Sequence, residues 1–573
     1  MKTRRNPALK LKKQTLSYFF AETVHRYKNK KFIALVGDEP LTYGEFARKT
    51  VALANFLKEK GIKKGHKIVL LGDNSPNWAI AYFAISLLGA VVVPILSEFP
   101  ESDINHILSH SEAVGAFVDD KFIDSMDLEY LNRMPAVFSL NRFAVLRDKS
   151  FKEESIWEKL QNLPGFFKRG MKNKIFGLGD NSEEDDLAEI LYTSGTTGHS
   201  KGVMLTHRNI VSNALLGPDI LGGLHAGSIV LNLLPLAHAY GCTTTFLGAF
   251  SGGAGLYLLS RKPSPKVLMD AMQQVKPTIV AGVPLVFEKI YHKKVVPQLT
   301  SKRTLRLISR MDMGRKFLYR QTGKKIMKSF GGRLETFVIG GASLNQEVET
   351  FLREAGVPFA IGYGLSECAP MVAGDVYKNL KFGSVGRPAR DVEVTILEPD
   401  ARSGVGEIAV KGPNVMQGYY KNPEETKKVF TKDGWLRTGD LAVMDKQRYL
   451  FIRGRSKNVH VGPSGENIYP EVVEDKLRES MFVEEALVYV ENDKLTARIY
   501  LDYDHVQTVL GAPKHTVQPK EIDKILENIR KETNGKLPAY SAISQICEQP
   551  EPFEKTPTNK IKRMVYVPDY PSR

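Results

Sequence analysis

The sequence predicts an α/β protein. We expect a large N-terminal domain of mixed, mainly parallel sheets with helices, a small β-barrel-like subdomain, and a small mobile α+β C-terminal domain. The chain has 573 residues, too many for one hydrophobic core. Short apolar runs bounded by Gly, Pro or Asp alternate with amphipathic stretches, which is typical of parallel strands buried under helices. After about Asp391 the sequence pattern changes to that of strands separated by short turns.

The first clear element is KIVLLGD, residues 67–73, which predicts a buried strand. The following run, residues 78–96, is apolar and long enough to span a bilayer. However, Gly89 and Pro94 interrupt it, and it is rich in Ala and Leu before Gly89 but contains Val-Val-Val after it. We therefore expect a buried helix, a glycine stop and a buried strand instead of a membrane span.

Further strands are predicted in order along the chain. In the N-terminal part they are AVGAFVDD, SIVLNLLPL, AGLYLLS, TIVAGVP and ETFVIGGA, and in the subdomain they are VEVTILEPD, GEIAVKG and YLFIRGR. The last hundred or so residues then begin with an expected helix, ENIYPEVVEDKLRES, and a strand, EALVYVEN. The charged segment RGRSKN lies between the subdomain strands and this C-terminal part, so we predict domains at residues 1–453 and 454–573.

Composition and charge indicate which broad class of protein this is. The residues are 42% hydrophobic and 25% charged, as in globular proteins, and three widely spaced cysteines argue against a disulfide framework or a zinc site. We therefore expect a reducing, cytoplasmic location. The net charge is +16, with one basic cluster in residues 1–13 and another in residues 289–328. Two interpretations of these basic clusters stay open: peripheral contact with an anionic membrane at the inner face, and ordinary solvated helix faces. No nucleic-acid-binding motif accompanies the clusters.

A loop rich in Gly, Ser and Thr, YTSGTTGHSKG, occupies residues 192–202. An apolar strand precedes it, and we expect a helix-compatible stretch after it. Glycines let backbone N–H groups converge on an anion, hydroxyl groups add donors, and Lys201 adds a mobile positive charge. The loop therefore predicts polyphosphate binding. Its spacing is neither the Walker pattern nor the dinucleotide fingerprint.

The loop resembles the phosphate loop of the adenylate-forming superfamily, which includes acyl-CoA synthetases. Ser200 stands where that family usually has Pro. The resemblance extends from about Leu41 to Arg563. It implies an ATP- and AMP-binding set, which comprises Thr193, Ser194, Gly195, Thr196, Thr197, Gly198, Lys201, Gly341, Ala342, Tyr363, Gly364, Ser366, Asp440 and Arg455.

Individual roles follow from the same resemblance. In GYGLSECAP, Tyr363 is expected to stack on adenine, and Glu367 to hold Mg²⁺, a role suited to a carboxylate beside a hydroxyl. Asp440 and Arg455 are expected to bind the ribose hydroxyls. Lys560, in EKTPTNKIKR, is the candidate catalytic lysine together with Lys201 and Glu367, although Asn559 replaces the usual Gly.

The remaining expected roles concern the acyl group, the hinge and the thiol. His238, in LPLAHAYG, and Gly341 are expected at the acyl site, Lys457 at the hinge, and Gly465 and Glu466 facing the coenzyme A tunnel. VPLVFEKIY is similar to a segment of long-chain acyl-CoA synthetases, with Leu285 in place of Arg.

The resemblance implies an ATP-dependent fatty acid–CoA ligase of the long-chain branch, with ATP, Mg²⁺ and coenzyme A required. A fatty acyl-AMP ligase or acyl-carrier-protein synthetase is the close alternative, because it shares the first step. A regulatory protein that kept the fold and lost the chemistry is a third reading, which the joint presence of Lys201, Glu367, Asp440, Arg455 and Lys560 disfavours. Chain length, acceptor and oligomeric state, a homodimer included, stay open.

Overall fold

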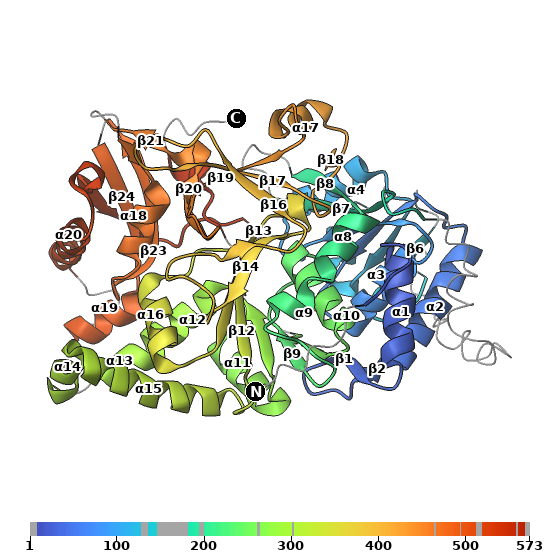
Figure 1. Cartoon of the computed structure of the whole chain (residues 1–573), viewed down its shortest axis with the longest axis horizontal. Coiled ribbons are helices and arrows are strands. Elements are labelled where there is room, and N and C mark those ends of the chain that lie inside the picture. Colours follow the sequence, from blue (N-terminus) through green and yellow to red (C-terminus); the bar gives the residue numbers. More distant parts are fainter. Residues whose placement is uncertain are drawn as a thin grey trace.

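The computed structural model describes residues 9–127, 134, 136–145, 182–193, 200–260, 264–300, 303–462, 466–492, 494–511, 518–556 and 560–567. Two large sheets form most of the N-terminal part, and the C-terminal residues build a separate lobe, drawn in orange and red (Figure 1). This is the α/β architecture that the sequence predicts.

One sheet has seven strands in the order β18-β8-β7-β4-β3-β5-β6. Its core strands β7, β4, β3, β5 and β6 run parallel, and β8 and β18 extend it as antiparallel strands. The strands are β3 (Lys67–Leu71), β4 (Val91–Ile95), β5 (Gly115–Val118), β6 (Ala136–Ser139), β7 (Leu187–Thr193), β8 (Lys201–Thr206) and β18 (Gly418–Tyr419).

The second sheet has nine strands in the order β15-β14-β13-β12-β11-β9-β10-β1-β2. Strands β1, β10, β9, β11, β12 and β13 are parallel neighbours, and antiparallel strands close both edges. The strands are β1 (Lys31–Leu35), β2 (Leu41–Thr42), β9 (Ile229–Asn232), β10 (Gly255–Leu258), β11 (Ile279–Gly282), β12 (Thr336–Gly340), β13 (Phe359–Gly364), β14 (Met371–Val376) and β15 (Arg387–Pro388).

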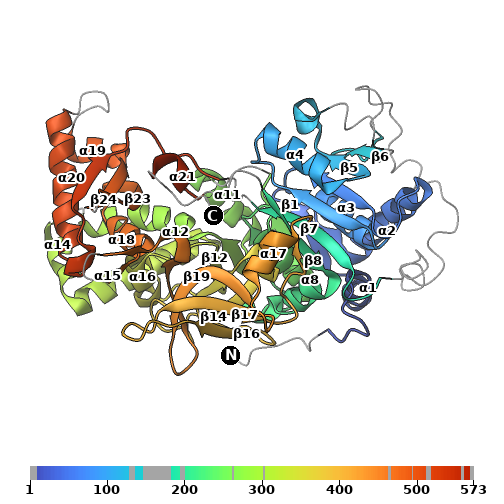
Figure 2. The same ribbon diagram turned by 90° about the horizontal axis from the view of Figure 1, so that it is seen from above.

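Helices cover these sheets (Figures 1 and 2). Residues of α1, α2, α3 and α10 share one aromatic core, in which the rings of Phe83 and Phe250 lie 5.0 Å apart. The helices of the N-terminal part are α1 (Leu16–Tyr27), α2 (Tyr43–Glu59), α3 (Pro76–Ser86), α4 (Glu101–Ser111), α8 (His207–Ala214), α9 (Gly217–Ile220), α10 (Gly248–Ser251), α11 (Pro265–Val275), α12 (Pro284–Ile290), α13 (Val296–Thr300), α14 (Arg303–Arg310), α15 (Asp312–Ser329) and α16 (Gln346–Ala355).

The apolar run at residues 78–96 folds as predicted. Helix α3 ends before Gly89, whose φ of +65° stops the helix, and the chain continues as the buried strand β4. Among the described residues, no helix combines the length and the apolar character needed to cross a bilayer.

The subdomain is a four-stranded antiparallel sheet in the order β16-β17-β19-β20, as the short-turn pattern indicates. Its strands are β16 (Glu393–Leu397), β17 (Gly406–Lys411), β19 (Leu436–Met444) and β20 (Leu450–Arg455), and α17 (Pro423–Val429) lies between β18 and β19.

The C-terminal lobe has its own hydrophobic core, made by residues between Ile468 and Ile543. The exact boundary at residues 453/454 stays a prediction, as does the mobility of the lobe. Its elements are β21 (His460–Val461), β22 (Asn467–Ile468), α18 (Pro470–Leu477), β23 (Val483–Glu491), β24 (Lys494–Leu501), α19 (Tyr503–Leu510), α20 (Pro519–Asn534), β25 (Gln545–Glu548) and α21 (Arg563–Tyr566).

One expectation about the Gly/Ser/Thr loop is wrong. The stretch directly after it is not helical: it is strand β8, which pairs with β7 so that Lys201 lies opposite Thr193. Strand pairing wins here because Val203 and Leu205 are buried against the sheet, and the helix begins only at His207, after the Thr206 cap.

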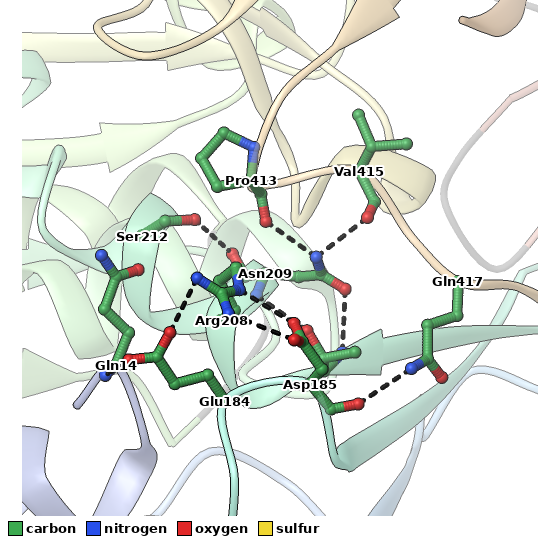
Figure 3. A network of polar contacts seen from close by, with 10 residues as sticks. Gln14, Glu184, Asp185, Arg208, Asn209, Ser212, Pro413, Val415 and Gln417 are labelled. Carbon is green, nitrogen blue, oxygen red and sulfur yellow. Dashed lines mark hydrogen bonds and ion pairs between the residues drawn. The ribbon is translucent and has the colours of Figure 1, made fainter. Parts of the chain in front are cut away.

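A polar network holds this region to the segment that precedes β18 (Figure 3). Asn209, on α8, donates to the backbone carbonyls of Pro413 (2.8 Å) and Val415 (2.9 Å). Gln417 donates to the carbonyl of Asp185, whose carboxylate pairs with Arg208. These bonds fix the position of β18, which carries side chains into the candidate site.

Candidate active site

The candidate site lies where parallel strands of the nine-stranded sheet end. The carboxyl ends of β9, β12 and β13 lead to the His238 segment, to Gly341 and to Tyr363. Ligands in open α/β sheets bind at this edge. Gly341 has a φ of +88°, and residues 341–343 are exposed, so the backbone there is accessible to a flat ligand.

Asp440 connects two strands of the subdomain to the end of β13. Its carboxylate accepts a hydrogen bond from the Tyr363 hydroxyl (2.7 Å) and pairs with Arg455 Nε (2.8 Å). Asp440 and Arg455 are opposite neighbours on β19 and β20, so the sheet register brings the pair together. The Asp440 side chain is largely buried, whereas Arg455 is half-exposed.

Glu367 and Lys201 are joined through Tyr419. The Tyr419 hydroxyl donates to Glu367 Oε1 (2.9 Å), and Lys201 Nζ lies 5.3 Å from the centroid of the Tyr419 ring. Lys201 also forms an ion pair with Glu425 on α17 (2.5 Å). Proximity to Lys201 and Lys428 lowers the pKa of Glu425 and keeps it ionised.

Lys560 lies in the C-terminal lobe, where its backbone is paired with that of Thr556. Its carbonyl accepts from Thr556 N (2.7 Å), and its own N–H donates to Thr556 Oγ1 (3.2 Å). Lys555 pairs with Glu485 and Arg563 with Glu474, so the chain on both sides of this backbone pair is tied to the lobe. Helix α21, which begins at Arg563, lies in the middle of the molecule in Figure 2, between the lobe and the N-terminal half.

Although solvent reaches Lys560, its side chain lies among groups of the N-terminal part. Surrounding protein and the Arg455 charge lower its pKa, and the attraction of Asp440 and Glu367 opposes that change. Burial lowers the pKa of His238 to about 4, with a smaller contribution from the Lys560 charge. His238 is therefore neutral at pH 7 and lies on the same side of the site as Lys560.

Four cations of the candidate site lie within electrostatic range of one another. Burial lowers the pKa of Lys457 to about 8, and repulsion from Arg455, Lys201, Arg563 and Lys560 adds to the effect. These cations come from different parts of the chain: Lys201 from β8, Arg455 from β20, Lys457 from η5 (Ser456–Asn458) and Lys560 from the segment before α21. The ion pairs of Lys201 with Glu425 and of Arg455 with Asp440 offset part of the repulsion, and the group of cations is suited to a polyanion.

The predicted residues are placed as follows. The structure describes fourteen of them: Thr193, Lys201, His238, Gly341, Ala342, Tyr363, Gly364, Ser366, Glu367, Asp440, Arg455, Lys457, Glu466 and Lys560. The other six lie outside the described residues: Ser194, Gly195, Thr196, Thr197, Gly198 and Gly465. Glu466 lies beside the β21–β22 pair of the C-terminal lobe, where its carbonyl accepts from Gly462 N (2.8 Å). The role of each residue stays a prediction.

Gly364 has a clear steric reason to be glycine. A Cβ there would lie 2.1 Å from the carbonyl oxygen of Pro370, which no side chain could accept.

Cys242 and Cys368 are buried, and burial raises the pKa of both thiols, so neither is poised as a nucleophile. A surface cavity of about 890 Å³ beside Asp219, Arg387 and Arg390 has none of the predicted site residues in its lining.

The residues around Glu367 fit a phosphate-bound Mg²⁺. In the part of the chain that the structure describes, no cluster of three or more His, Cys, Asp or Glu side chains forms a protein-only metal cage. Mg²⁺ that travels with a nucleotide needs only one or two carboxylates, because phosphate oxygens and waters complete its octahedron. Glu367, with the Ser366 hydroxyl next to it, supplies that donor set.

Two contributors to the site were not predicted from the sequence. Tyr419 and Glu425 come from GYYKNPEE, residues 418–425, and contact Glu367 and Lys201. Glu425 is 224 positions from Lys201, so only the pairing of β18 with β8 brings them together. The only sequence signal was an aromatic pair followed by an acidic helix start.

Comparison with known proteins places the chain in a family. The family model described as "AMP-binding enzyme" matches residues 20–420. A long-chain-fatty-acid–CoA ligase, FadD15 of Mycobacterium bovis, is 30% identical over 78% of this chain and 75% of its own length. The long-chain-fatty-acid–CoA ligase of Bacillus subtilis is 28% identical over 84% of this chain and 83% of its own.

A relative with another acceptor is similar as well. The chloroplastic long-chain-fatty-acid–[acyl-carrier-protein] ligase AEE15 of Arabidopsis thaliana is 27% identical over 92% of this chain and 81% of its own length.

Among solved structures, ATP-bound MatB from Rhodopseudomonas palustris has a TM-score of 0.73 at 22% identity, over 96% of this chain and 98% of its own. The anthranilate CoA ligase AuaEII in complex with anthranoyl-AMP has a TM-score of 0.75 at 20% identity, over 99% and 98%. These two likenesses confirm the predicted fold. With the family match over most of the sequence and the convergent site residues, they lead to one conclusion: this chain is a member of the AMP-binding enzyme family.

Proposed function

We propose that this protein is an ATP-dependent long-chain fatty acid–CoA ligase. It activates a fatty acid to acyl-AMP with release of pyrophosphate, and then transfers the acyl group to coenzyme A. The observation that carries the proposal is the charged site in which Arg455 pairs with Asp440, and Lys201 and Glu367 both contact Tyr419, with Lys457 and Lys560 within electrostatic range. A polyphosphate needs those cations, a ribose needs an acceptor such as Asp440, and a nucleotide-bound metal needs a carboxylate.

Nucleotide binding would use both the acidic and the basic side chains of this site. The Asp440 carboxylate accepts the ribose hydroxyls, held in place by Arg455, while Tyr363 presents its ring to adenine. Lys201 leaves Glu425 and follows the phosphates, together with the Gly/Ser/Thr loop. Mg²⁺ at Glu367 would neutralise phosphate charge when bound.

The first half-reaction is an in-line displacement. A carboxylate oxygen of the fatty acid attacks the α-phosphorus, the bond from that phosphorus to the β-phosphate oxygen breaks, and pyrophosphate leaves. Negative charge develops on the oxygens of the transferring phosphorus, where Lys560 and Lys201 stabilise it. His238, neutral at pH 7 because its pKa is about 4, can border the acyl carboxylate without competing as a cation.

The second half-reaction requires access for a thiol. The thiol gives up its proton to solvent, its sulfur attacks the acyl carbonyl carbon, and AMP leaves with the mixed-anhydride oxygen. In our account the C-terminal lobe rotates about Lys457 between the two steps and withdraws Lys560. Polar contacts between the lobe and the N-terminal part support this, because such interfaces permit domain motion: Ser343–Asp475 (3.3 Å), Gln346–Lys476 (3.0 Å) and Lys289–Glu484 (3.9 Å).

The proposed preference for long acids and for coenzyme A is supported by the relatives, two of which are named long-chain-fatty-acid–CoA ligases. Each methylene buried in an apolar tunnel adds roughly 0.8 kcal/mol, so long acids should be strongly preferred. The alternative acceptor, an acyl carrier protein, is supported by the similarity to the Arabidopsis ligase of that type. We place the enzyme in the reducing cytoplasm, where its three cysteines stay free thiols.

One assay separates these readings. Pyrophosphate release is measured for acids from acetate to palmitate, with coenzyme A, with acyl carrier protein, and with neither. We expect kcat/KM to rise steeply with chain length and thioester to form with coenzyme A. Thioester on the carrier protein alone would support the alternative, and equal kcat/KM for acetate and palmitate would contradict the long-chain proposal.

A further inference from the structure

The α14–α15 surface is an unusual concentration of exposed apolar side chains. Leu307, Ile308, Met311, Met313 and Phe317 are exposed by 63%, 40%, 67%, 85% and 60%. They are five of the twelve large hydrophobic residues exposed in the described part of the chain, yet they fall within eleven positions. A single exposed leucine needs no explanation, but a contiguous group does.

These side chains are not a displaced part of the core. The opposite side of α15 is fully used: Leu318 and Ile326 pack on the core, and the buried Tyr319 hydroxyl bonds to that of Tyr291 (3.2 Å). Arg315 pairs with Glu354 of α16 (2.8 Å) and fixes the rotation of the helix about its axis. Met313 and Phe317 are therefore held facing outward by contacts on the other face.

Cations continue the same outward stripe. Met313, Phe317, Arg320, Lys324 and Lys328 are spaced by four, three, four and four residues, which places them on one side of the helix. Arg320, Lys324 and Lys328 are exposed, as are Arg310 and Lys325 nearby. Within the described ranges, no ion pair to an acidic side chain is found for these five cations, so their charge faces solvent.

We infer that the α14–α15 surface docks on the headgroup region of an anionic lipid bilayer. A helix lying flat with apolar side chains toward the acyl boundary and Lys or Arg beside them is the pattern of interfacial binding. Helix α15 lies along the lower edge of the molecule, with α14 at its outer end (Figure 1). Nucleic acid would match the cations but leave the apolar group without a partner. This inference does not rest on the proposed enzymatic activity.

The test is co-sedimentation of the full chain with vesicles of phosphatidylcholine, alone or mixed with phosphatidylglycerol, at low and high salt. We expect binding to the mixed vesicles at low salt and weaker binding at high salt, because salt screens the cations. Each Lys or Arg near such a surface contributes about fivefold in partitioning, so Lys324→Glu/Lys328→Glu should reduce binding at least tenfold. Met313→Glu/Phe317→Glu should reduce it similarly by removing the inserted side chains.

Matched controls make the result specific. Lys520→Glu/Lys524→Glu reverses two exposed cations four residues apart on α20, and Phe382→Glu/Val509→Glu changes two exposed apolar residues elsewhere. Circular dichroism and thermal melting establish that each variant is folded. Equal loss in test and control pairs would overturn the inference, as would wild-type protein that shows no preference for anionic vesicles.

One further outcome is distinguishable. If wild-type protein ignored vesicles but formed a dimer in gel filtration that Met313→Glu/Phe317→Glu converted to monomer, the surface would be an interface between copies of the chain. That result would also overturn the lipid inference.

Discussion

Asp440→Asn tests the proposed ribose site with little change in shape. The carboxylate of Asp440 has two oxygens, of which one accepts from Tyr363 and the other faces Arg455. Asparagine keeps one acceptor but turns the other position into a donor, which cannot pair with Arg455. A hydrogen bond to a charged acceptor contributes roughly 1.5–3 kcal/mol, against about 1 kcal/mol for a neutral one. The ribose should therefore lose most of its charge-assisted bonding.

Binding of ATP, 2′-deoxy-ATP and 3′-deoxy-ATP to wild type and variant is measured by isothermal titration calorimetry. We expect wild type to lose affinity when a ribose hydroxyl is absent, and Asp440→Asn to lose about 2- to 30-fold for ATP, which corresponds to the difference of roughly 0.5–2 kcal/mol between a charged and a neutral acceptor. The variant should then discriminate little between ATP and the deoxy nucleotides. If it discriminated as strongly as wild type, Asp440 would not be the ribose acceptor.

Three other predictions concern Glu425, Glu189 and Lys457. Glu425 competes with phosphate for Lys201, so Glu425→Gln should tighten ATP binding by up to about fivefold, as expected for losing a part-exposed ion pair; weaker binding in the same titration would show that Glu425 instead orients the lysine. Burial raises the pKa of Glu189 to about 7, whereas in the unfolded chain the carboxyl loses its proton near pH 4.3, that is at about the ordinary glutamate pKa. The stability of the fold therefore falls as the pH rises from about 4.3 to about 7. Glu189→Gln should raise the melting temperature at about pH 8, where the ionisation penalty is on the order of 3 kcal/mol, but not at about pH 4; an equal effect at both would refute the assignment. Lys457→Pro should stiffen the proposed hinge and slow thioester formation from synthetic acyl-adenylate while sparing pyrophosphate release, and single-turnover assays showing the opposite pattern would exclude a hinge there.

The elements that the sequence predicted best are those with one dominant signal. Strands β3, β4 and β12 are continuous apolar runs, and burial on both faces leaves little alternative. Strand β8 was predicted wrongly because a short apolar run after a loop fits a strand or a helix start equally, and its pairing with β7 decides. Local sequence carries no information about that pairing.

The site shows the same division. Asp440 and Arg455 were expected from their motifs, and the register of β19 on β20 explains their contact. Tyr419 and Glu425 could not be expected, because they reach Lys201 only through an edge strand distant in sequence. The lowered pKa values of Lys457 and His238 likewise depend on charges and burial that only the assembled domains create.

The most direct test of the account is Lys560→Ala, with the two half-reactions measured separately. Lys560 approaches Asp440, Glu367 and Arg455 in this arrangement of the lobe, where a cation can stabilise charge at the α-phosphate. Losing such a group should lower the rate of ATP-dependent pyrophosphate release by about 10²–10³-fold or more. Synthetic acyl-adenylate plus coenzyme A should still give thioester at close to the wild-type rate, because that step does not need the lysine. Equal loss in both half-reactions would mean that Lys560 is structural and would contradict the two-conformation mechanism.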